Sequence, residues 1–150
     1  MPINHSVDER LELFVMRFSG TVTEAEICDS IARVAADLPP DGSFRSLLIF
    51  DRSTDLSAID KDVLQSVQDR ARDTLYRIPH RERRGGAAMI DGSLDAKFIL
   101  PLWNALSHSD PEIDMHYDIF TTLDSALNWL EIPKGQGLSL IRGTEQTVND

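Results

Sequence analysis

Short apolar segments alternate with longer amphipathic segments along the chain, and this alternation restricts the folds that it can form. The segment 46–50 (Ser-Leu-Leu-Ile-Phe) is apolar on both faces, which is typical of a strand that is covered on two sides. Helix-like spacing of apolar residues precedes it at 23–38 and follows it at 60–78. Strands joined by helices of this length run parallel, because the crossover returns the chain to the same end of the sheet. The sequence therefore predicts an α/β fold.

The complete pattern predicts a mixed, mainly parallel sheet of four to six strands with about four packed helices. Strands are expected at 11–19, 46–50, 85–90 and 114–120. Helices are expected at 23–38, 60–78, 94–107 and from 122 to before 133. We expect one domain over residues 1–150, with a core at about 3–132, an edge strand at 137–142 and a frayed end at 143–150.

The charge balance disfavours some classes of partner. The chain has 15 Lys and Arg against 25 Asp and Glu, and this net charge of −10 opposes broad binding to nucleic acid. No apolar stretch approaches the about 18 residues of a membrane span, and the first residues lack the basic and apolar regions of a signal peptide. The lone cysteine, Cys28, fits a reducing compartment. We therefore expect a cytoplasmic protein with no nucleic-acid partner.

Three segments carry a resemblance to a known fold family. A strand leads through 20–23 (Gly-Thr-Val-Thr) into a helix, and 47–51 (Leu-Leu-Ile-Phe-Asp) is a strand with an aspartate at its end. The most specific segment is 118–130 (Asp-Ile-Phe-Thr-Thr-Leu-Asp-Ser-Ala-Leu-Asn-Trp-Leu). Together they resemble the bacterial STAS fold of anti-sigma-factor antagonists and sulfate-transporter tails, in its antagonist-like branch. The resemblance implies an N-terminal hairpin that runs from Ile3 into the strand at 11–19.

The same resemblance suggests an alternative function as a phospho-switched antagonist. Family members of that kind carry Asp-Ser-Ser-Gly-Leu at the start of the second helix, whereas 60–64 here reads Asp-Lys-Asp-Val-Leu. Lys61 stands where the family has a serine, and a lysine cannot accept a phosphoryl group in that switch. Ser53, Thr54 and Ser57 lie just upstream and could be modified, although we expect Ser57 to cap the second helix.

A second alternative is an enzyme built on Asp51 and Asp91, which follow strands that we expect to be neighbours. If both carboxylates point into one cleft, they could bind a cation or share a proton. No Gly-x-Ser-x-Gly, Walker or Gly-x-Gly-x-x-Gly motif accompanies them. The segment 108–118, rich in acidic residues and histidine, is interpreted as a solvated loop rather than a metal site. We therefore expect no catalytic residue, no cofactor and no metal ligand.

The predicted third helix contains an unusual run of six apolar residues at 98–103, which wraps the whole helix at 100° a residue. The residues expected to face the sheet are Leu94, Phe98, Leu102 and Ala105. That orientation leaves Ile99, Leu100 and Trp103 as a patch that something must cover. The tail at 138–141, a dimer partner, a lipid surface and a bound ligand are the alternatives.

From these features we expect a non-enzymatic regulatory or binding module that uses an apolar surface or pocket around the third helix. The residues expected to contact the ligand or partner are Asp51, Arg52, Ser53, Asp91, Ser93, Ile99, Leu100 and Trp103. The expected partner is a second copy of the chain, another protein, or an apolar, lipid-like ligand.

A cluster of arginines offers a separate surface. Six of the fifteen cations lie within 70–84, where only two acidic residues accompany them. Cations near the end of a helix are favoured by its dipole, and this is the simpler interpretation. The alternative is an anion site or a peripheral membrane surface formed by Arg77, Arg81, Arg83 and Arg84.

Overall fold

The chain begins with a β-hairpin. The structure is a computed structural model that describes residues 2–39, 42–75, 81–108, 116–133 and 135. Strand β1 (Ile3–Asp8) pairs antiparallel with β2 (Leu13–Phe18). The turn is closed by the Leu11 amide, which donates to the Asp8 carboxylate at 3.0 Å. The hairpin that the resemblance implied is therefore present.

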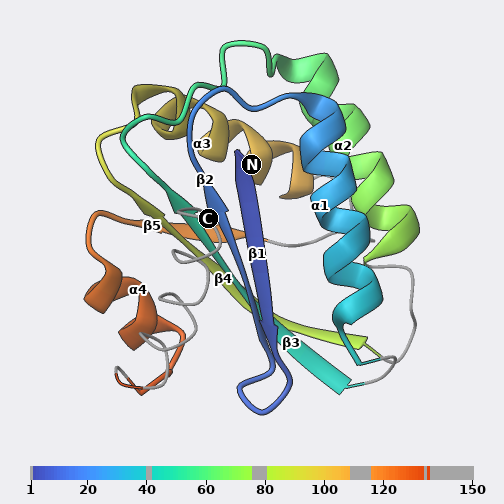
Figure 1. Ribbon diagram of the computed structural model, residues 1–150, viewed down its shortest axis with the longest axis vertical. Helices are drawn as coiled ribbons and strands as arrows, with labels where there is room; N and C mark the ends of the chain where they lie inside the picture. The colour runs from blue at the N-terminus through green and yellow to red at the C-terminus, as the bar shows by residue number, and fades with distance from the viewer. Residues whose placement is uncertain (1, 40–41, 76–80, 109–115, 134, 136–150) are drawn as a thin grey trace.

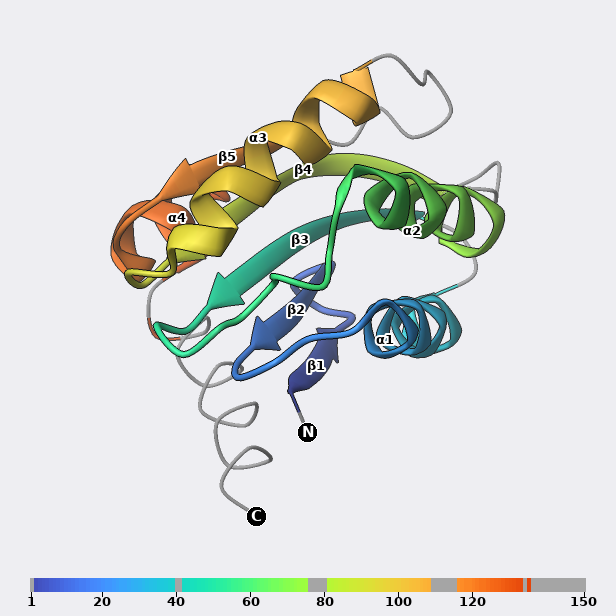
Figure 2. The ribbon, with the colours of Figure 1, turned by 90° about the horizontal axis from the view of Figure 1, so that it is seen from above.

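Three helical crossovers follow the hairpin. The further strands are β3 (Gly42–Phe50), β4 (Arg81–Ile90) and β5 (Tyr117–Phe120), and the sheet has the order β1-β2-β3-β4-β5. Neighbouring strands from β2 to β5 are parallel. The helices are α1 (Glu24–Asp37), α2 (Lys61–Thr74), α3 (Leu94–His108) and α4 (Leu123–Trp129). The crossover helices α1, α2 and α3 share one face of the sheet, and α4 covers the other (Figures 1 and 2).

The sheet buries side chains on both faces, which explains the two-sided apolar character of 46–50. Successive side chains of a strand point to opposite faces. In β3, Leu48 and Phe50 belong to the core beneath α1, α2 and α3, whereas Leu47 and Ile49 belong to the core beneath α4. The predicted α/β class and the mainly parallel sheet are confirmed.

A buried arginine ties α4 to the hairpin. Arg45 of β3 is only 8% exposed, and its Nη1 donates to the Leu130 carbonyl at 2.6 Å while its Nη2 donates to the Leu11 carbonyl. Hydrogen bonds to a charged group contribute about 1.5–3 kcal/mol each. The C-terminal end of α4 is thereby held beside the hairpin turn, at the beginning of the parallel strands.

Side-chain caps fix the starts of the helices, mostly at the predicted positions. Thr23 and Glu26 form a capping box at the start of α1. The cap of α2 is Asp60, whose carboxylate accepts a backbone amide at 2.9 Å. Our assignment of this cap to Ser57 was therefore wrong. The Ser57 amide donates instead to the Asp55 carboxylate, which turns the chain before the helix begins.

The ends of the elements differ from the prediction by a few residues. Strands β3 and β4 begin at Gly42 and Arg81 rather than at 46 and 85, because these two strands pair with each other at their N-terminal ends. Strand β5 begins at Tyr117 rather than at 114. The predicted edge strand at 137–142 and the end at 143–150 lie outside the described residues. Within the described parts of the chain, none of the helices combines the length and apolar character needed to cross a bilayer.

Gly86 is required by the packing of β4 against β5. A Cβ at this position would lie 2.6 Å from two ring carbons of Tyr117 and 2.9 Å from Ser46 Oγ, which itself donates to the Tyr117 hydroxyl at 3.1 Å. We predict that Gly86→Ala lowers the free energy of unfolding by about 1–3 kcal/mol, as measured by urea denaturation, because the ring must shift inside a packed core. In a Tyr117→Ala background the same substitution should cost much less. An equal cost in both backgrounds would contradict this account.

Candidate functional site: an apolar cavity beneath α3

An apolar cavity of about 80 Å³ lies between the sheet and the helices α1, α2 and α3. Protein interiors are close-packed and contain few voids larger than a water molecule, so an opening of this size is notable in a small domain. Among the residues that line it, only Trp103 and Tyr117 carry a polar group on the side chain. The lining residues are Phe14, Met16, Phe18, Ile27, Ile31, Val34, Leu48, Phe50, Leu56, Ile59, Leu64, Val67, Ala71, Leu75, Ile99, Leu100, Trp103 and Tyr117.

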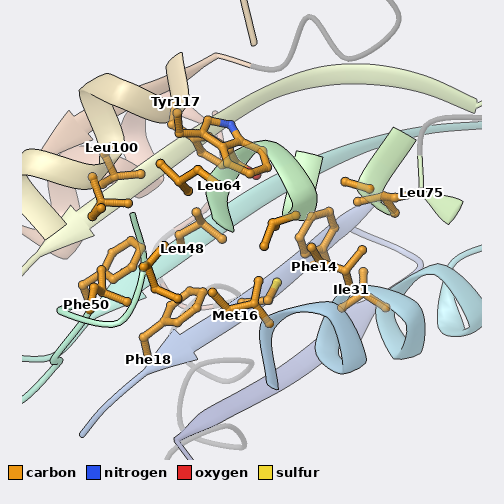
Figure 3. A pocket seen from close by; sticks show the side chains of 18 residues that line it. Phe14, Met16, Phe18, Ile31, Leu48, Phe50, Leu64, Leu75, Leu100 and Tyr117 are labelled. Carbon is orange, nitrogen blue, oxygen red and sulfur yellow. The ribbon is translucent and has the colours of Figure 1, made fainter. Parts of the chain in front are cut away.

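Strands and helices both contribute to the wall. Figure 3 shows Phe18 and Phe50 at one end of the lining, and Phe14 and Leu75 at the other. The rings of Phe18 and Phe50 are stacked with their centroids 4.5 Å apart and an interplanar angle of 8°. Because these side chains come from β2, β3 and α2, the cavity is built by the central crossovers of the fold.

Helix α3 is rotated relative to our prediction. Leu94, Phe98 and Ala105 were expected to face the sheet, but all three are exposed, Leu94 and Phe98 by 69% and 79%. Leu102 packs against the core as predicted. Ile99, Leu100 and Trp103 were expected to point away, but they pack against the core and line the cavity. These three residues are therefore part of the candidate site from its inner side.

Small and polar side chains decide this rotation. Ala96 and Ser107 lie on the inner face of α3 and are almost completely buried, which allows the helix to approach the sheet closely. Asn104 then fixes the helix against β5, because its Nδ2 donates to the Tyr117 carbonyl at 2.8 Å and its Oδ1 accepts from the Tyr117 amide at 2.9 Å. This amide pair was missed at the sequence level, since a single Asn within an apolar helix has no distinctive spacing.

Two buried polar atoms near the cavity have no hydrogen-bond partner among the described residues. They are the indole nitrogen Nε1 of Trp103, which lines the cavity, and the side-chain oxygen Oε1 of Gln68. Gln68 is fully buried on α2, and its Nε2 donates to the Trp103 carbonyl at 3.0 Å. Of the two residues only Trp103 lines the cavity, and a ligand hydroxyl could accept from its indole nitrogen.

The two strand-end aspartates do not form a shared site. Asp51 is held by Arg17, with Nη2 of the arginine 3.1 Å from Oδ1 of the carboxylate. Asp91 is exposed and lies 3.7 Å from Nη2 of Arg52, which is itself 81% exposed. Neither aspartate lines the cavity. The two carboxylates engage different arginines, and this geometry lends no support to acid–base cooperation between them.

The serines predicted to contact a ligand hold the loop that closes the cavity. Ser93 is buried, and its hydroxyl donates to the Thr54 carbonyl at 3.1 Å and accepts from the Ala96 amide at 3.3 Å. The Ser53 hydroxyl accepts from the Gly20 amide at 3.2 Å. The Leu56 amide donates to the Asp95 carboxylate at 2.9 Å, which joins the same loop to α3. The loop thereby places Leu56 and Ile59 against the cavity.

The arginine surface cannot be assigned from the described residues. Arg77 lies outside them, and of Arg81, Arg83 and Arg84 the structure describes only the backbone, within β4. Among the described residues, no three His, Cys, Asp or Glu side chains gather as they would around a metal ion.

In comparisons with known proteins, no model of a protein family, no curated protein and no solved structure gives a significant match.

The Asn104 amide provides a test of how α3 is held over the cavity. We predict that Asn104→Ala lowers the free energy of unfolding by about 1–3 kcal/mol, because two backbone groups of Tyr117 lose their partners. Hydrogen exchange at the Tyr117 amide should become faster at the same time. Asn128→Ala, at an exposed position of α4, serves as the matched control and should change neither quantity. Unchanged exchange at Tyr117 in the Asn104 variant would contradict this role.

The loop that closes the cavity should respond to acid through Asp55. Hydrogen bonds from the side chain and the backbone of Ser57 lower the pKa of Asp55 below its ordinary value. The carboxylate therefore stabilises the loop above the ordinary carboxyl pKa, and this contribution is lost as the pH falls through the lowered pKa. In an NMR titration, the Ser57 amide should shift with the Asp55 carboxyl, at a midpoint below that of the urea-unfolded chain. A midpoint at or above the unfolded value would be inconsistent with the hydrogen bond.

Proposed function

We propose that the protein is a non-enzymatic binding module that holds a small, mainly apolar molecule in the cavity beneath α3. The observation that carries the proposal is the cavity itself, with its volume of about 80 Å³ and its apolar wall. Empty apolar cavities destabilise a protein by about 24 cal/mol per Å³, so this one costs about 2 kcal/mol. A ligand that fills the cavity restores the missing van der Waals contacts.

The chemistry of the wall defines the class of ligand. The cavity is about half as large as the ~150 Å³ engineered cavity that takes up benzene in another protein, so a short hydrocarbon matches it. The unpartnered indole nitrogen of the lining residue Trp103 adds a donor. Leaving such a buried donor unsatisfied costs about 1–3 kcal/mol. The ligand that we propose is accordingly a short alkyl chain with one hydroxyl group.

We also propose a regulatory role and a STAS-like identity for this domain. Two features support the likeness in fold: the antiparallel hairpin at the N-terminus and the three crossover helices on one face of the sheet. A ligand in the cavity would contact α1, α2, α3 and the closing loop together. Its binding energy would hold these elements in a single arrangement, which is how a small ligand can control a binding module.

The other two functions receive less support from the geometry. For the phospho-switched antagonist, Thr54 is buried and the Ser53 hydroxyl already accepts a backbone amide. The exposed Ser57 remains as a candidate, but its side chain donates a hydrogen bond to the Asp55 carboxylate. For an enzyme, the carboxylates of Asp51 and Asp91 lie in separate ion pairs. The apolar cavity brings together residues of β2, β3, β5, α1, α2 and α3.

Tryptophan fluorescence tests the binding directly. Trp103 lines the cavity, whereas Trp129 is 42% exposed on α4, on the other face of the sheet. In a Trp129→Phe variant, titration with 1-propanol should change the Trp103 emission in a saturable manner and raise the melting temperature. Stabilisation should reach about 2.7 kcal/mol at 100 times the dissociation constant. Propane should bind less tightly, because it leaves the Trp103 indole nitrogen unsatisfied.

Two variants distinguish the cavity from other sites. Ala71→Val adds methyl groups to the wall and should weaken propanol binding at least tenfold, and Val67→Ile is the substitute if that variant does not fold. In Trp103→Phe, the remaining Trp129 should report no change. A signal that does not saturate, or one that Ala71→Val leaves intact, would refute the proposed site.

A further inference from the structure

Most side chains that line the cavity are buried, but a few are half-buried and mark where its wall is thinnest. These are Ile27 of α1 and Ile99 and Trp103 of α3. Because Ile99 and Trp103 are four residues apart, they lie one above the other on the same flank of the helix. Gln68 of α2 donates to the Trp103 carbonyl, so this flank faces α2. The cavity therefore comes close to solvent between α2 and α3.

The flank that α3 turns toward α2 is apolar. At about 100° a residue, it carries Ile99, Leu102, Trp103 and Leu106, all of them half-buried and packed at the margin of the core. The Asn104 side chain lies on the opposite flank, where it is bonded to Tyr117 of β5. Helix α3 is thus fixed by paired hydrogen bonds on one flank and by apolar contacts on the other.

The flank that α2 turns toward α3 is polar. On the same helical spacing, Lys61, Gln65 and Arg72 lie around Gln68. Gln65 and Arg72 both donate to Asp69 of their own helix, at 3.4 and 2.9 Å. We call the junction of these two flanks the α2–α3 seam. A polar flank gains little from burial against an apolar one, so the seam is held less firmly than a junction of two apolar flanks.

Pro101 weakens α3 beside the seam. It lies within the helix and has no amide proton, so the Lys97 carbonyl loses the hydrogen bond that it would otherwise accept from position 101. Trp103 follows two residues later. A helix that is weakened at this point and anchored through Asn104 can move away from α2 while it stays attached to β5.

The other two borders of the cavity are joined more firmly. The closing loop is bonded on both sides, because the Asp55 amide donates to the Gly20 carbonyl at 2.8 Å and the Leu56 amide donates to Asp95 of α3 at 2.9 Å. Between α1 and α2 the contact is apolar from both helices, with Ile27 and Val63 packed against the same core.

We propose that small molecules enter and leave the cavity through the α2–α3 seam, with the Trp103 side chain as the gate. The proposal rests on the proposed function, which supplies the ligand that passes. Trp103 suits this role because its ring lines the cavity and is half-buried at the seam. Its Nε1 has no hydrogen-bond partner among the described residues, so the indole turns outward without breaking a bond to any of them.

Hydrogen exchange of the Trp103 indole proton tests the gate without a ligand. In a Trp129→Phe variant, this proton gives the only indole signal in the NMR spectrum. We expect an exchange rate that low urea concentrations hardly change, because opening the seam exposes little surface. Leu106→Ala shortens a seam side chain that does not line the cavity, and should speed the exchange about tenfold. Leu123→Ala, at a half-buried leucine of α4 on the other face of the sheet, is the matched control and should leave it unchanged.

Ligand kinetics test the same gate, with 1-propanol as the probe. Leu106→Ala should raise the association and dissociation rates by the same factor and leave the dissociation constant unchanged, because the cavity wall is intact. Leu106→Val is the substitute if the alanine variant does not fold.

Failure of the gate can be distinguished from failure of the proposed function. An indole proton that exchanges only through global unfolding, with the full urea dependence, would overturn the gate even if propanol binds. Faster binding in Asp95→Ala but not in Leu106→Ala would also overturn it, and would place the route at the closing loop. An indole proton that exchanges through local opening in a chain that binds no propanol would support the gate and refute the proposed ligand.

Discussion

The packing of three crossover helices on a single face of the sheet is the constraint on which the rest of this structure depends. The order β2-β3-β4-β5 with all strands parallel requires a helix between each pair, and α1, α2 and α3 all lie on the same side. Figure 2 shows α1 and α2 end-on, whereas α3 runs across the view. Helices that meet a twisted sheet at different angles cannot fill every space between them, and the cavity lies where these three converge.

Helix α3 has two apolar faces, one toward the cavity and one toward the surface. Its inner face carries Ile99, Leu100 and Trp103 at the cavity, and its outer face exposes Leu94 and Phe98. The run of six apolar residues is explained in part by the inner face, which packs against the core. In our proposal that inner face also meets the ligand.

Much of the fold was predictable from the sequence, because the periodicity of apolar residues and the residues that cap or end helices are local signals. The apolar segment at 46–50 predicted β3. The residue Thr23 caps α1 and marks where that helix begins. The rotation of α3 was not predictable in this way, since a helix that is apolar all round has no preferred face in its own pattern. Its orientation depends on the fit of Ala96 against the sheet and on the bond between Asn104 and β5, which are tertiary contacts.

The candidate site was predictable in part for the same reason. A pocket around the third helix was expected, but its walls come from strands and helices far apart in the sequence, and Gln68 reads as an ordinary surface residue of an amphipathic helix. The strand-end polar residues had clear sequence signals, yet the structure uses Ser53 and Ser93 to hold a loop. A local motif shows which polar side chains a segment contains, whereas the tertiary packing determines which of them face a ligand.

The most direct measurement is a crystal structure determined under xenon pressure. Xenon enters apolar cavities without needing hydrogen bonds, so it tests whether the space beneath α3 accepts a guest independently of any polar group. Our account predicts a xenon peak enclosed by Phe14, Leu64, Leu100 and Trp103. Continuous side-chain density across this region, with no xenon bound, would show that the cavity is closed by its own residues and would contradict the proposed function.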